Sequence, residues 1–600
     1  MNKYKLYPLP QEMEYSGSSF AVPKSVRIVS NFDLSTGIQS RLIEALALEN
    51  IAMNSQADFS INLELRPDLE TAEKQFDYYE LDVSAEGISL RGKKESGIYY
   101  GVNTLYQVLD QVKQAEPAES QTEIQAFNLV DYADLAIRGI IEGYYGIPWG
   151  NKKRADIFEF NSYFKMNAYA FAPKNDPYHR ERWFDLYPET ELEEIGKLAR
   201  FAEEHYIHYI WTISPFAPLG YKITTDNQEE GYAKIETKFE QLYKVGVRQF
   251  GVLGDDAGDL PYKTVVYIMN KLNKWRKEKG DVEELIYCPQ GYTTQEWAFK
   301  DGEELRIIDL EFDADIHIIY TGKTVCWPIT DDAIDDFKHK ATAAGQVRRD
   351  PLFWMNWPVN DIDTSTFRRL FMGPGIVYQA GANRLTGVLT NPMEQPEASN
   401  VANFATNDFA WNVDEFNPEQ SWIDSFQWIE PNAPAALHEI CKHSTSQLYT
   451  GAMRDCAKES VEIEELAQKL EEVYPDANYE TVIQELKDEY QKIIDAVETF
   501  RNLSENEDLL IEMDGWLLAL TDKGLAGVNY CDAILTKERK YHDAANRYRK
   551  YSFEHYVPAI TNYKLWAQIG TQVINPNLKR LKEIADEVRG VVVENSAVFD

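Results

Sequence analysis

The chain has 600 residues, enough for about two to four domains, and its 44% hydrophobic and 26% charged residues are ordinary for a soluble globular protein. Its net charge of −37 at pH 7 disfavours nucleic acid and anionic membranes as partners, because both are negatively charged. No segment approaches the roughly 18 to 20 consecutive apolar residues of a membrane span, and the first residues lack the apolar core of a signal peptide.

Residues 1–125 predict a small α/β domain. Short apolar runs and helical periodicity indicate strands at Ser25–Ser30 and Ile61–Leu65, a helix between them, a hairpin over Tyr79–Arg91 and a second helix over Gly101–Val112. The stretch Gln114–Gln125 is polar, contains one proline and lacks periodicity. We therefore expect it to be a linker.

Residues 126–432 follow a repeated pattern, in which a short apolar strand ends in polar or glycine residues and a longer helical segment comes next. Eight such strands end at Glu142, Lys174, Ser214, Asp255, Cys288, Thr321, Asn356 and Asn391. Eight alternations over about 260 residues predict an α/β fold in which this region is a parallel (β/α)8 TIM barrel and the catalytic domain.

Two adjacent acids, Asp255 and Asp256, stand where an apolar strand stops abruptly. In a barrel of this kind the carboxyl ends of the strands form the active face, so a charged pair at that point indicates catalysis. The structural alternative is that one of the two acids only caps the helix that follows.

Seven short motifs at the strand ends form a recognisable set: RGIIEGYYGIPW (Arg138–Trp149), APKND (Ala172–Asp176), GDDAGD (Gly254–Asp259), CPQGY (Cys288–Tyr292), YTG (Tyr320–Gly322), WMNWPVND (Trp354–Asp361) and TNPME (Thr390–Glu394). Together they resemble glycoside hydrolase family 84, which contains O-GlcNAcases and bacterial β-N-acetylglucosaminidases often labelled hyaluronidases. The stretch Ser96–Leu109 also resembles the small domain that precedes the barrel in this family and in hexosaminidases.

The resemblance implies substrate-assisted catalysis, in which the 2-acetamido oxygen of the sugar attacks the anomeric carbon and forms an oxazoline with net retention. This scheme differs from the usual pair of a protein nucleophile and an acid. Carried over by position, Asp255 holds the acetamide nitrogen, whereas Asp256 protonates the leaving oxygen and later deprotonates water.

The resemblance assigns the other strand ends to sugar binding. Gly143 and Tyr145 belong to one loop, Lys174, Asp361 and Asn391 bind hydroxyls, Tyr292 binds the acetamido oxygen, Asn356 lies near the glycosidic oxygen, and Cys288, Thr321 and Trp354 line the acetamide pocket. Taken singly, each of these residue types is more often structural. Their common position after the strands favours the functional interpretation.

The sequence departs from the family pattern at two places. Asn175 stands where many relatives have an acid, and Gly254 stands where we expect a bulky apolar residue. The segment His438–His443 has one residue too many for a helical HExxH zinc motif, and we expect it to be a helix surface. We predict no metal and no cofactor.

Residues 433–600 predict a C-terminal helical-bundle domain. Val461–Val473 and Asn577–Val588 show helical periodicity. One further apolar stripe consists of Val482, Leu486, Tyr490, Ile493, Val497 and Phe500. We interpret the stripe as bundle core, and the alternative is a groove that binds a partner.

The favoured function is an exo-acting, retaining β-N-acetylglucosaminidase for terminal β-linked GlcNAc, including O-GlcNAc on Ser and Thr of proteins. Its partners would be GlcNAc-containing glycans or glycoproteins, and the chain would be a monomer or homodimer. The alternatives are an endo-hyaluronidase, which the high negative charge disfavours, and a non-catalytic GlcNAc-binding module, which the acid pair disfavours.

Five widely spaced cysteines indicate neither a disulfide framework nor a zinc site: Cys288, Cys326, Cys441, Cys456 and Cys531. A reducing compartment fits this composition best. We therefore expect a cytoplasmic protein, with a secreted form that has lost its signal as the alternative.

Overall fold

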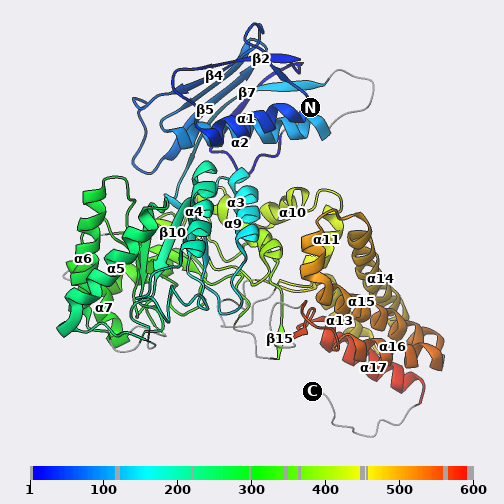
Figure 1. Cartoon of the computed structure of the whole chain (residues 1–600). Coiled ribbons are helices and arrows are strands. Elements are labelled where there is room, and N and C mark those ends of the chain that lie inside the picture. Colours follow the sequence, from blue (N-terminus) through cyan, green and yellow to red (C-terminus); the bar gives the residue numbers. More distant parts are fainter. Residues whose placement is uncertain are drawn as a thin grey trace.

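The computed structural model describes residues 4–114, 122–217, 220–257, 260–295, 299–341, 349–361, 366–445, 453, 457–476, 478–558 and 565–590. Figure 1 shows three regions: an N-terminal sheet covered by helices, a barrel below it, and a group of long helices beside the barrel. No helix among these residues is long and apolar enough to cross a membrane.

The N-terminal region is a seven-stranded mixed sheet with the order β1-β7-β5-β6-β4-β2-β3. Its elements are β1 (Glu12–Ala21), β2 (Ser25–Ser30), α1 (Thr36–Leu48), β3 (Ala52–Met53), β4 (Ser60–Leu65), β5 (Phe76–Ser84), β6 (Gly87–Gly92), α2 (Glu95–Gln114) and β7 (Glu123–Ala133). The buried side chains of α1 and α2 share one apolar core with the sheet. The predicted strands, hairpin and helices are therefore confirmed, although α2 begins six residues earlier than expected.

The predicted linker is partly wrong. Residues 123–125 belong to β7, which pairs with β1 and β5 inside the first sheet, while residues 115–121 lie outside the described residues. The start of β7 was missed because the polar residues before it show no alternation. The alternation of polar and apolar side chains that is typical of a strand begins only at Glu123. We propose that the first domain extends to about Ala133.

The predicted eight-stranded barrel is confirmed. The strands close in the order β10-β11-β12-β13-β14-β16-β8-β9, and every neighbouring pair is parallel. They are β8 (Ile137–Glu142), β9 (Ala168–Phe171), β10 (His208–Ile213), β11 (Gln249–Leu253), β12 (Ile286–Cys288), β13 (His317–Tyr320), β14 (Leu352–Met355) and β16 (Gly387–Thr390). Each ends within three residues of the predicted position.

Helices surround the barrel: α3 (Asn151–Tyr163), α4 (Glu189–Glu204), α5 (Gln228–Tyr243), α6 (Tyr262–Lys279), α7 (Phe299–Glu311), α8 (Asp331–Ala341) and α9 (Pro396–Trp411), with the 3-10 turn η1 (Thr225–Asn227) before α5. Between β14 and β16 the described chain contains only the short strand β15 (Phe367–Arg368). Inside the barrel, small and branched side chains such as Ala170, Ile210 and Leu389 form a closed apolar cluster. The barrel is thus a packed core and not a pore.

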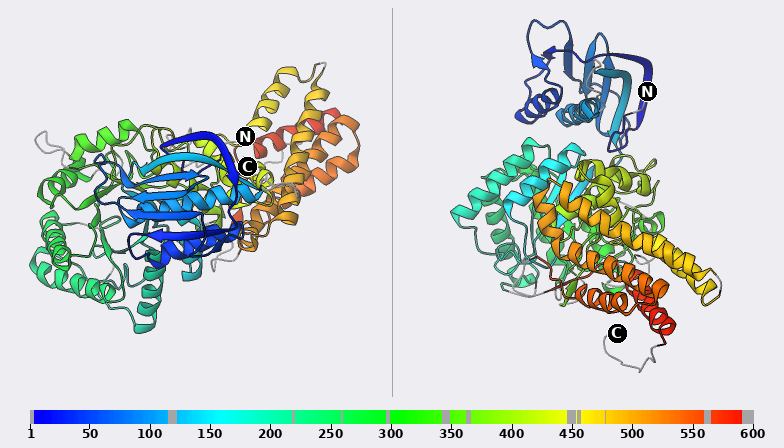
Figure 2. Two further views of the ribbon diagram at one scale, coloured as in Figure 1. Left: turned by 90° about the horizontal axis from the view of Figure 1, so that it is seen from above. Right: turned by 90° about the vertical axis from the view of Figure 1, so that its right-hand side faces the viewer.

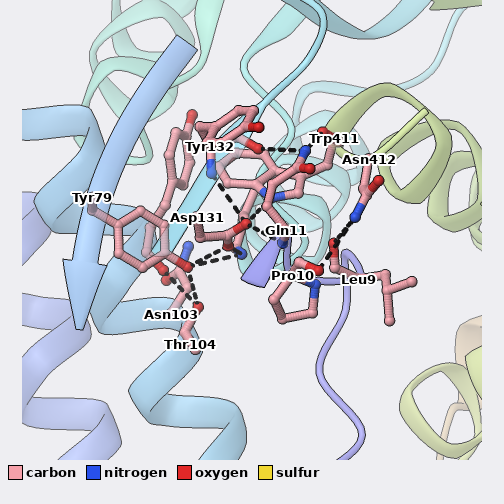
Figure 3. Close-up of polar contacts among 12 residues, drawn as sticks. Leu9, Pro10, Gln11, Tyr79, Asn103, Thr104, Asp131, Tyr132, Trp411 and Asn412 are labelled. Carbon is pink, nitrogen blue, oxygen red and sulfur yellow. Dashed lines mark hydrogen bonds and ion pairs between the residues drawn. The ribbon is translucent and has the colours of Figure 1, made fainter. Parts of the chain in front are cut away.

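A buried polar cluster joins the N-terminal sheet to the barrel, as Figure 3 shows around Asp131 of β7. Its carboxylate accepts hydrogen bonds from Tyr79 Oη at 2.6 Å and Trp411 Nε1 at 2.7 Å, and it lies 2.8 Å from Lys165 Nζ. Because Asp131, Tyr79 and Trp411 are buried, these bonds replace the hydrogen bonds to water that the polar groups lose on burial. They bind the last strand of the sheet to α9 and to the end of α3.

The C-terminal helices are α10 (Pro418–Ile429), α11 (Pro434–Cys441), α13 (Val461–Val473), α14 (Tyr479–Leu503), α15 (Glu507–Thr536), α16 (Arg539–Tyr551) and α17 (Ile574–Val588), and the short strand β17 (Trp566–Ala567) precedes α17. All six residues of the predicted stripe are buried on α14. They share a core with α15, α17 and barrel residues such as Met393. Figure 2 shows these helices projecting to one side of the barrel.

The segment His438–His443 is not a plain helix surface, because His443 is buried beyond the end of α11 and its Nδ1 lies 2.8 Å from Ser460 Oγ. Among the described cysteines, Cys288, Cys326, Cys441 and Cys531 are buried and are not joined in disulfides. Cys456 lies outside the described residues.

Candidate active site

A cavity of about 340 Å³ opens at the carboxyl ends of the barrel strands, which is a size common for small-ligand pockets. All twelve residues that the sequence singled out line it: Gly143, Tyr145, Lys174, Asp255, Asp256, Cys288, Tyr292, Thr321, Trp354, Asn356, Asp361 and Asn391. Three others, Val325, Cys326 and Val359, complete the lining. The convergence of the predicted residues on one pocket is therefore observed.

The N-terminal sheet lies on the opposite side of the barrel from this cavity. A second, wider crevice is lined both by N-terminal residues such as Lys94 and by residues at the amino ends of barrel strands, including Asn167, His208 and Gln249. Parallel strands place their two ends on opposite faces of a barrel. The N-terminal domain therefore covers the face away from the candidate site (Figure 1).

Asp255 is a buried carboxylate that forms an ion pair with Lys174 across the cavity. Burial alone would lower the pKa of Lys174, but the charge and hydrogen bond of Asp255 outweigh it and the pKa is raised, so the lysine stays charged. The second oxygen of Asp255, Oδ1, is buried without a hydrogen-bond partner among the described residues. A buried acceptor of this kind favours a ligand that brings an N–H donor.

Asp256 has a different environment, although it is the next residue. Its side chain is exposed at the pocket and accepts a hydrogen bond from the hydroxyl of Tyr145. Its backbone is left-handed, with φ of 54°, a conformation that is uncommon for residues other than glycine but is several-fold enriched in aspartate. The turn separates the two carboxylates and gives each its own partner.

Asp361 is fixed by the same loop that carries Tyr145. The backbone N–H of Tyr145 donates to Asp361 Oδ2 at 2.6 Å, and Arg368 Nη1 donates to the Asp361 carbonyl oxygen at 3.2 Å. Burial raises the pKa of the Asp361 carboxyl, against the lowering effect of the Tyr145 N–H. The loops after β8 and β14 are therefore bound together at the rim of the pocket.

Amide side chains form a second connection at the ends of β14 and β16. Asn391 Nδ2 donates to Asn356 Oδ1 at 2.9 Å, and Asn356 Nδ2 donates to the carbonyl oxygen of Val325 at 2.8 Å. The backbone N–H of Gly143 donates to Asn391 Oδ1 at 3.3 Å. These bonds fix the orientation of both amide groups, because an amide has one acceptor oxygen and one donor nitrogen that are not interchangeable.

The floor of the pocket is apolar and continuous with the interior of the barrel. Cys288 and Trp354 belong to the interior cluster and also line the cavity. Burial raises the pKa of the Cys288 thiol well above its usual value, so the thiol lines the pocket in its neutral form.

Gly143 has no room for a side chain, since an added Cβ would lie 2.4 Å from Trp354 Cζ2. Burial and the charges of Asp256 and Asp255 raise the pKa of Tyr292, which stays a hydroxyl donor.

Comparisons with known proteins agree with this arrangement. Residues 138–442, half of the chain, match the family model described as beta-N-acetylglucosaminidase, and residues 3–132 match domain 2 of glycosyl hydrolase family 20. The chain is 32% identical to CpGH84D of known structure, with a TM-score of 0.87 over 98% of this chain and all of that one. The chain belongs to glycoside hydrolase family 84.

Two further relatives extend the comparison. The solved structure of CpGH84B is 25% identical, with a TM-score of 0.81 over 96% of this chain and all of that one. Protein O-GlcNAcase of Rattus norvegicus is 31% identical over 282 residues, which are 44% of this chain and 29% of the rat protein. The match therefore spans less than a third of the curated relative.

Both departures from the family 84 pattern have local explanations. Gly254 donates its N–H to the Cys288 carbonyl oxygen at 2.7 Å, and an added Cβ would lie 3.0 Å from that oxygen and from Tyr287 Oη. A bulky residue would therefore not fit before the acid pair. Asn175 donates to the carbonyl oxygen of Gly146 at 2.6 Å, a bond that an ionised acid would not make.

Sequence reasoning missed four residues of this family 84 site. Val325, Cys326 and Val359 line the cavity, and Arg180 contacts Tyr145 at its edge, with Nη1 3.1 Å from the hydroxyl oxygen. Val359 lies inside a quoted motif and Arg180 lies six residues after Lys174. The sequence signal that could have identified these residues is their position inside or close to a quoted motif.

One group of three acids in the described chain has a spacing that suits a metal ion: Asp156, Glu397 and Asp508. Lys153 Nζ lies 3.0 Å from Glu397 and 2.5 Å from Asp508, and Lys152 Nζ lies 2.7 Å from Asp156. Each of the three carboxylates is therefore already paired with a lysine. The group lies outside the cavity and forms a surface ion-pair network.

Proposed function

We propose that this family 84 member is a retaining exo-β-N-acetylglucosaminidase that removes terminal β-linked GlcNAc, including O-GlcNAc on Ser and Thr, through an oxazoline intermediate. The observation that carries the proposal is that two adjacent acids, Asp255 and Asp256, share one pocket but are bound to different partners. Two carboxylates with separate partners can perform separate steps.

Asp255 would orient the 2-acetamido group. Its buried Oδ1 accepts the acetamide N–H, and Tyr292 donates its hydroxyl hydrogen to the acetamido oxygen, so that this oxygen lies below the anomeric carbon. As the oxygen attacks, positive charge develops on the acetamide. The Asp255 carboxylate then offsets that charge inside a site with little water.

Asp256 would act as acid and then as base. In the first step its proton passes to the glycosidic oxygen as the carbon–oxygen bond breaks. In the second step its carboxylate removes a proton from the water that opens the oxazoline. The exposed position of Asp256 at the mouth of the pocket suits both steps, because the aglycone leaves and water enters there.

The shape of the site favours an exo enzyme. The pocket is closed at its floor by Cys288 and Trp354, so it accepts a chain end more readily than the middle of a polymer. Lys174, Asp361 and Asn391 are placed to bind the hydroxyls of one terminal sugar. The net charge of −37 also gives hyaluronan, a polyanion, no electrostatic attraction to the protein.

The test of the mechanism uses aryl GlcNAc substrates whose acetamide methyl carries one, two or three fluorines. Fluorine withdraws electron density from the acetamido oxygen, so kcat/KM should fall steeply with each fluorine. A GlcNAc-thiazoline should also bind much more tightly than GlcNAc. A flat series, with a sugar ester trapped on Asp255 or Asp256, would replace substrate assistance with direct attack by a carboxylate.

Product analysis separates the other candidate functions. An endo-hyaluronidase shortens hyaluronan at once, whereas the proposed exo enzyme leaves its length nearly unchanged and releases single GlcNAc residues. A protein that binds aryl GlcNAc without turning it over would be a binding module. Release of GlcNAc from a panel of glycans and glycopeptides then identifies the natural aglycone.

A further inference from the structure

Three residues from three loops form a continuous polar chain beside the acid pair. Arg180 Nη1 lies 3.1 Å from the hydroxyl oxygen of Tyr145, and the Tyr145 hydroxyl contacts Asp256 Oδ2. The Arg180 guanidinium carbon also lies 5.5 Å from the centre of the Tyr145 ring. Arg180 itself does not line the cavity.

The chemistry of these groups sets the direction of both hydrogen bonds. Arginine has only donors, so the oxygen of Tyr145 must be the acceptor in the contact with Arg180. Burial and the bond to Asp256 raise the pKa of Tyr145, so it keeps its one hydroxyl hydrogen. That hydrogen is then directed to Asp256 Oδ2, which leaves Oδ1 of Asp256 to carry the proton given to the leaving group.

The loop after β9 presents Arg180 in a fixed position. Asp176 Oδ1 accepts the backbone N–H groups of Tyr178 and His179, both at 2.8 Å. His179 is fully buried, and its Nδ1 lies 2.8 Å from the carbonyl oxygen of Thr212. Since a carbonyl only accepts, Nδ1 is the donor and the ring is held in one orientation. Arg180 directly follows His179 in the chain, so the fixed position of His179 also fixes the backbone of Arg180.

We propose that Arg180 is a positioning residue that forces Tyr145 to donate to Oδ2 of Asp256 and thereby leaves Oδ1 of this acid–base group free for proton transfer to the leaving group. The inference rests on the proposed function, because it assigns a partner to the group that protonates the leaving oxygen. Arg180 touches no substrate atom in this scheme. It acts only through the tyrosine, by excluding the alternative in which the Tyr145 hydrogen points away from Asp256.

Other charged and titratable groups face the same carboxylate. Asp255 is adjacent in the chain, and Lys174, Cys288 and Tyr292 act on or respond to Asp256 from the ends of β9 and β12. All four remain in a variant of Arg180. A change in pH dependence that follows replacement of Arg180 alone is therefore assigned to the arginine and its tyrosine.

The test compares pH profiles of kcat/KM for Arg180→Gln and Arg180→Lys with the wild type, on an aryl GlcNAc with a poor leaving group. Glutamine offers an acceptor, so the Tyr145 hydrogen can turn away, and the alkaline limb should move to higher pH by about 0.5 to 1 unit. Lysine has only donors and should restore most of the wild-type profile. Turnover of the poor substrate by Arg180→Gln should fall about ten-fold, and that of an activated nitrophenyl substrate should fall much less.

Two further variants make the result specific. Arg182→Gln lies on the same loop, is exposed and pairs with Asp185, so its profile should match the wild type. In a Tyr145→Phe background, Arg180→Gln should produce no further shift, since two residues in one interaction are not additive. Thermal unfolding establishes that each variant is folded before its profile is measured.

The outcomes separate the two claims. A wild-type enzyme that turns over aryl GlcNAc, with an Arg180→Gln profile identical to its own, overturns the role of Arg180 and leaves the proposed function standing. A full further shift in the Tyr145→Phe background also overturns it, because the arginine would then act without the tyrosine. A wild-type protein with no turnover overturns both.

Discussion

Asp255 and Asp256 have the same chemistry and adjacent positions, and their neighbours make them different. Asp255 is buried against a lysine that stays charged, whereas Asp256 is exposed and bound to a neutral phenol. Its buried position beside Lys174 suits the role proposed for Asp255, which is to orient the acetamide and offset the positive charge that develops on it. The exposed position of Asp256 at the pocket mouth suits the acid and base role proposed for it, because the aglycone and water both pass there.

We expect the loss of activity in Asp256→Asn to depend on the leaving group of the substrate. Nitrophenyl GlcNAc substrates of low leaving-group pKa need no protonation and should lose less than about ten-fold in kcat/KM, while alkyl glycosides should lose about 10² to 10⁴-fold. Steady-state kinetics on a graded series of aryl and alkyl substrates measures the difference. Asp281→Asn, a surface carboxylate paired with Arg248, is the control and should change neither class. Equal losses on both classes would remove Asp256 from the role of acid.

At the scale of elements, the loops of the site depend on the C-terminal helices. The strands β15 and β17 pair in parallel, with Phe367 opposite Trp566 and Arg368 opposite Ala567. The carbonyl oxygen of Arg368 accepts from Trp516 Nε1 of α15 at 3.1 Å. The guanidinium of Arg368 reaches back to the Asp361 carbonyl oxygen and, at 3.5 Å, to buried Glu394. The bundle thus supports the loop that carries Asp361.

Replacing Arg368 by glutamine should weaken both binding and stability. The change leaves the Glu394 carboxylate buried without its cation, which costs about 3 kcal/mol, and it releases the Asp361 loop. We expect a clear fall in Tm and a rise in KM of about ten-fold with a smaller change in kcat. Arg384→Gln, whose partners Asp331 and Asp335 are exposed, should cost less than about 1 kcal/mol and leave KM unchanged. An unchanged KM in Arg368→Gln would show that Asp361 is held without the bundle.

The eight barrel strands were predictable because each is an apolar run that stops at a polar residue, a pattern that fully buried parallel strands impose. The edge strand β1 and the start of β7 were not, since exposed or alternating strands carry a weaker signal. The twelve lining residues followed from motifs at the strand ends. Their mutual contacts did not, because a hydrogen bond such as Tyr145 to Asp256 depends on how two distant loops fold toward each other.

The whole molecule is joined by buried polar groups at the borders between its domains. Asp131 and Lys165 connect the N-terminal sheet to the barrel. At the other border, Glu512 of α15 accepts the backbone N–H groups of Glu397 and Ala398 at 2.9 and 3.2 Å, at the start of α9. Bonds of this kind fix a single orientation of each domain on its neighbour.

Glu512 gives the stability of the protein a pH dependence of known sign. Burial and the charge of Glu397 raise its pKa from 4.5 to about 8. The folded state therefore binds a proton that the unfolded state has released, and stability falls as pH rises from 4.5 to 8. Glu512→Gln keeps an acceptor for α9 but cannot titrate, so the fall between pH 5 and 8 should be smaller by about 3 kcal/mol.

Denaturant unfolding of the wild type and of Glu512→Gln across this pH range measures the difference. A slope remains in the variant, because burial also raises the pKa values of Asp134 and Asp408 to about 6. Glu507→Gln, at the exposed start of the same helix, should keep the full wild-type slope. Identical slopes for the wild type and Glu512→Gln would assign the pH dependence to other groups.

The N-terminal sheet covers one face of the barrel and the candidate site opens on the other. A molecule immobilised through its first domain would consequently hold its pocket outward, toward the solution. Surface-bound substrates, such as glycans on a bead or on a cell, would then meet the open side of the pocket without hindrance from the support.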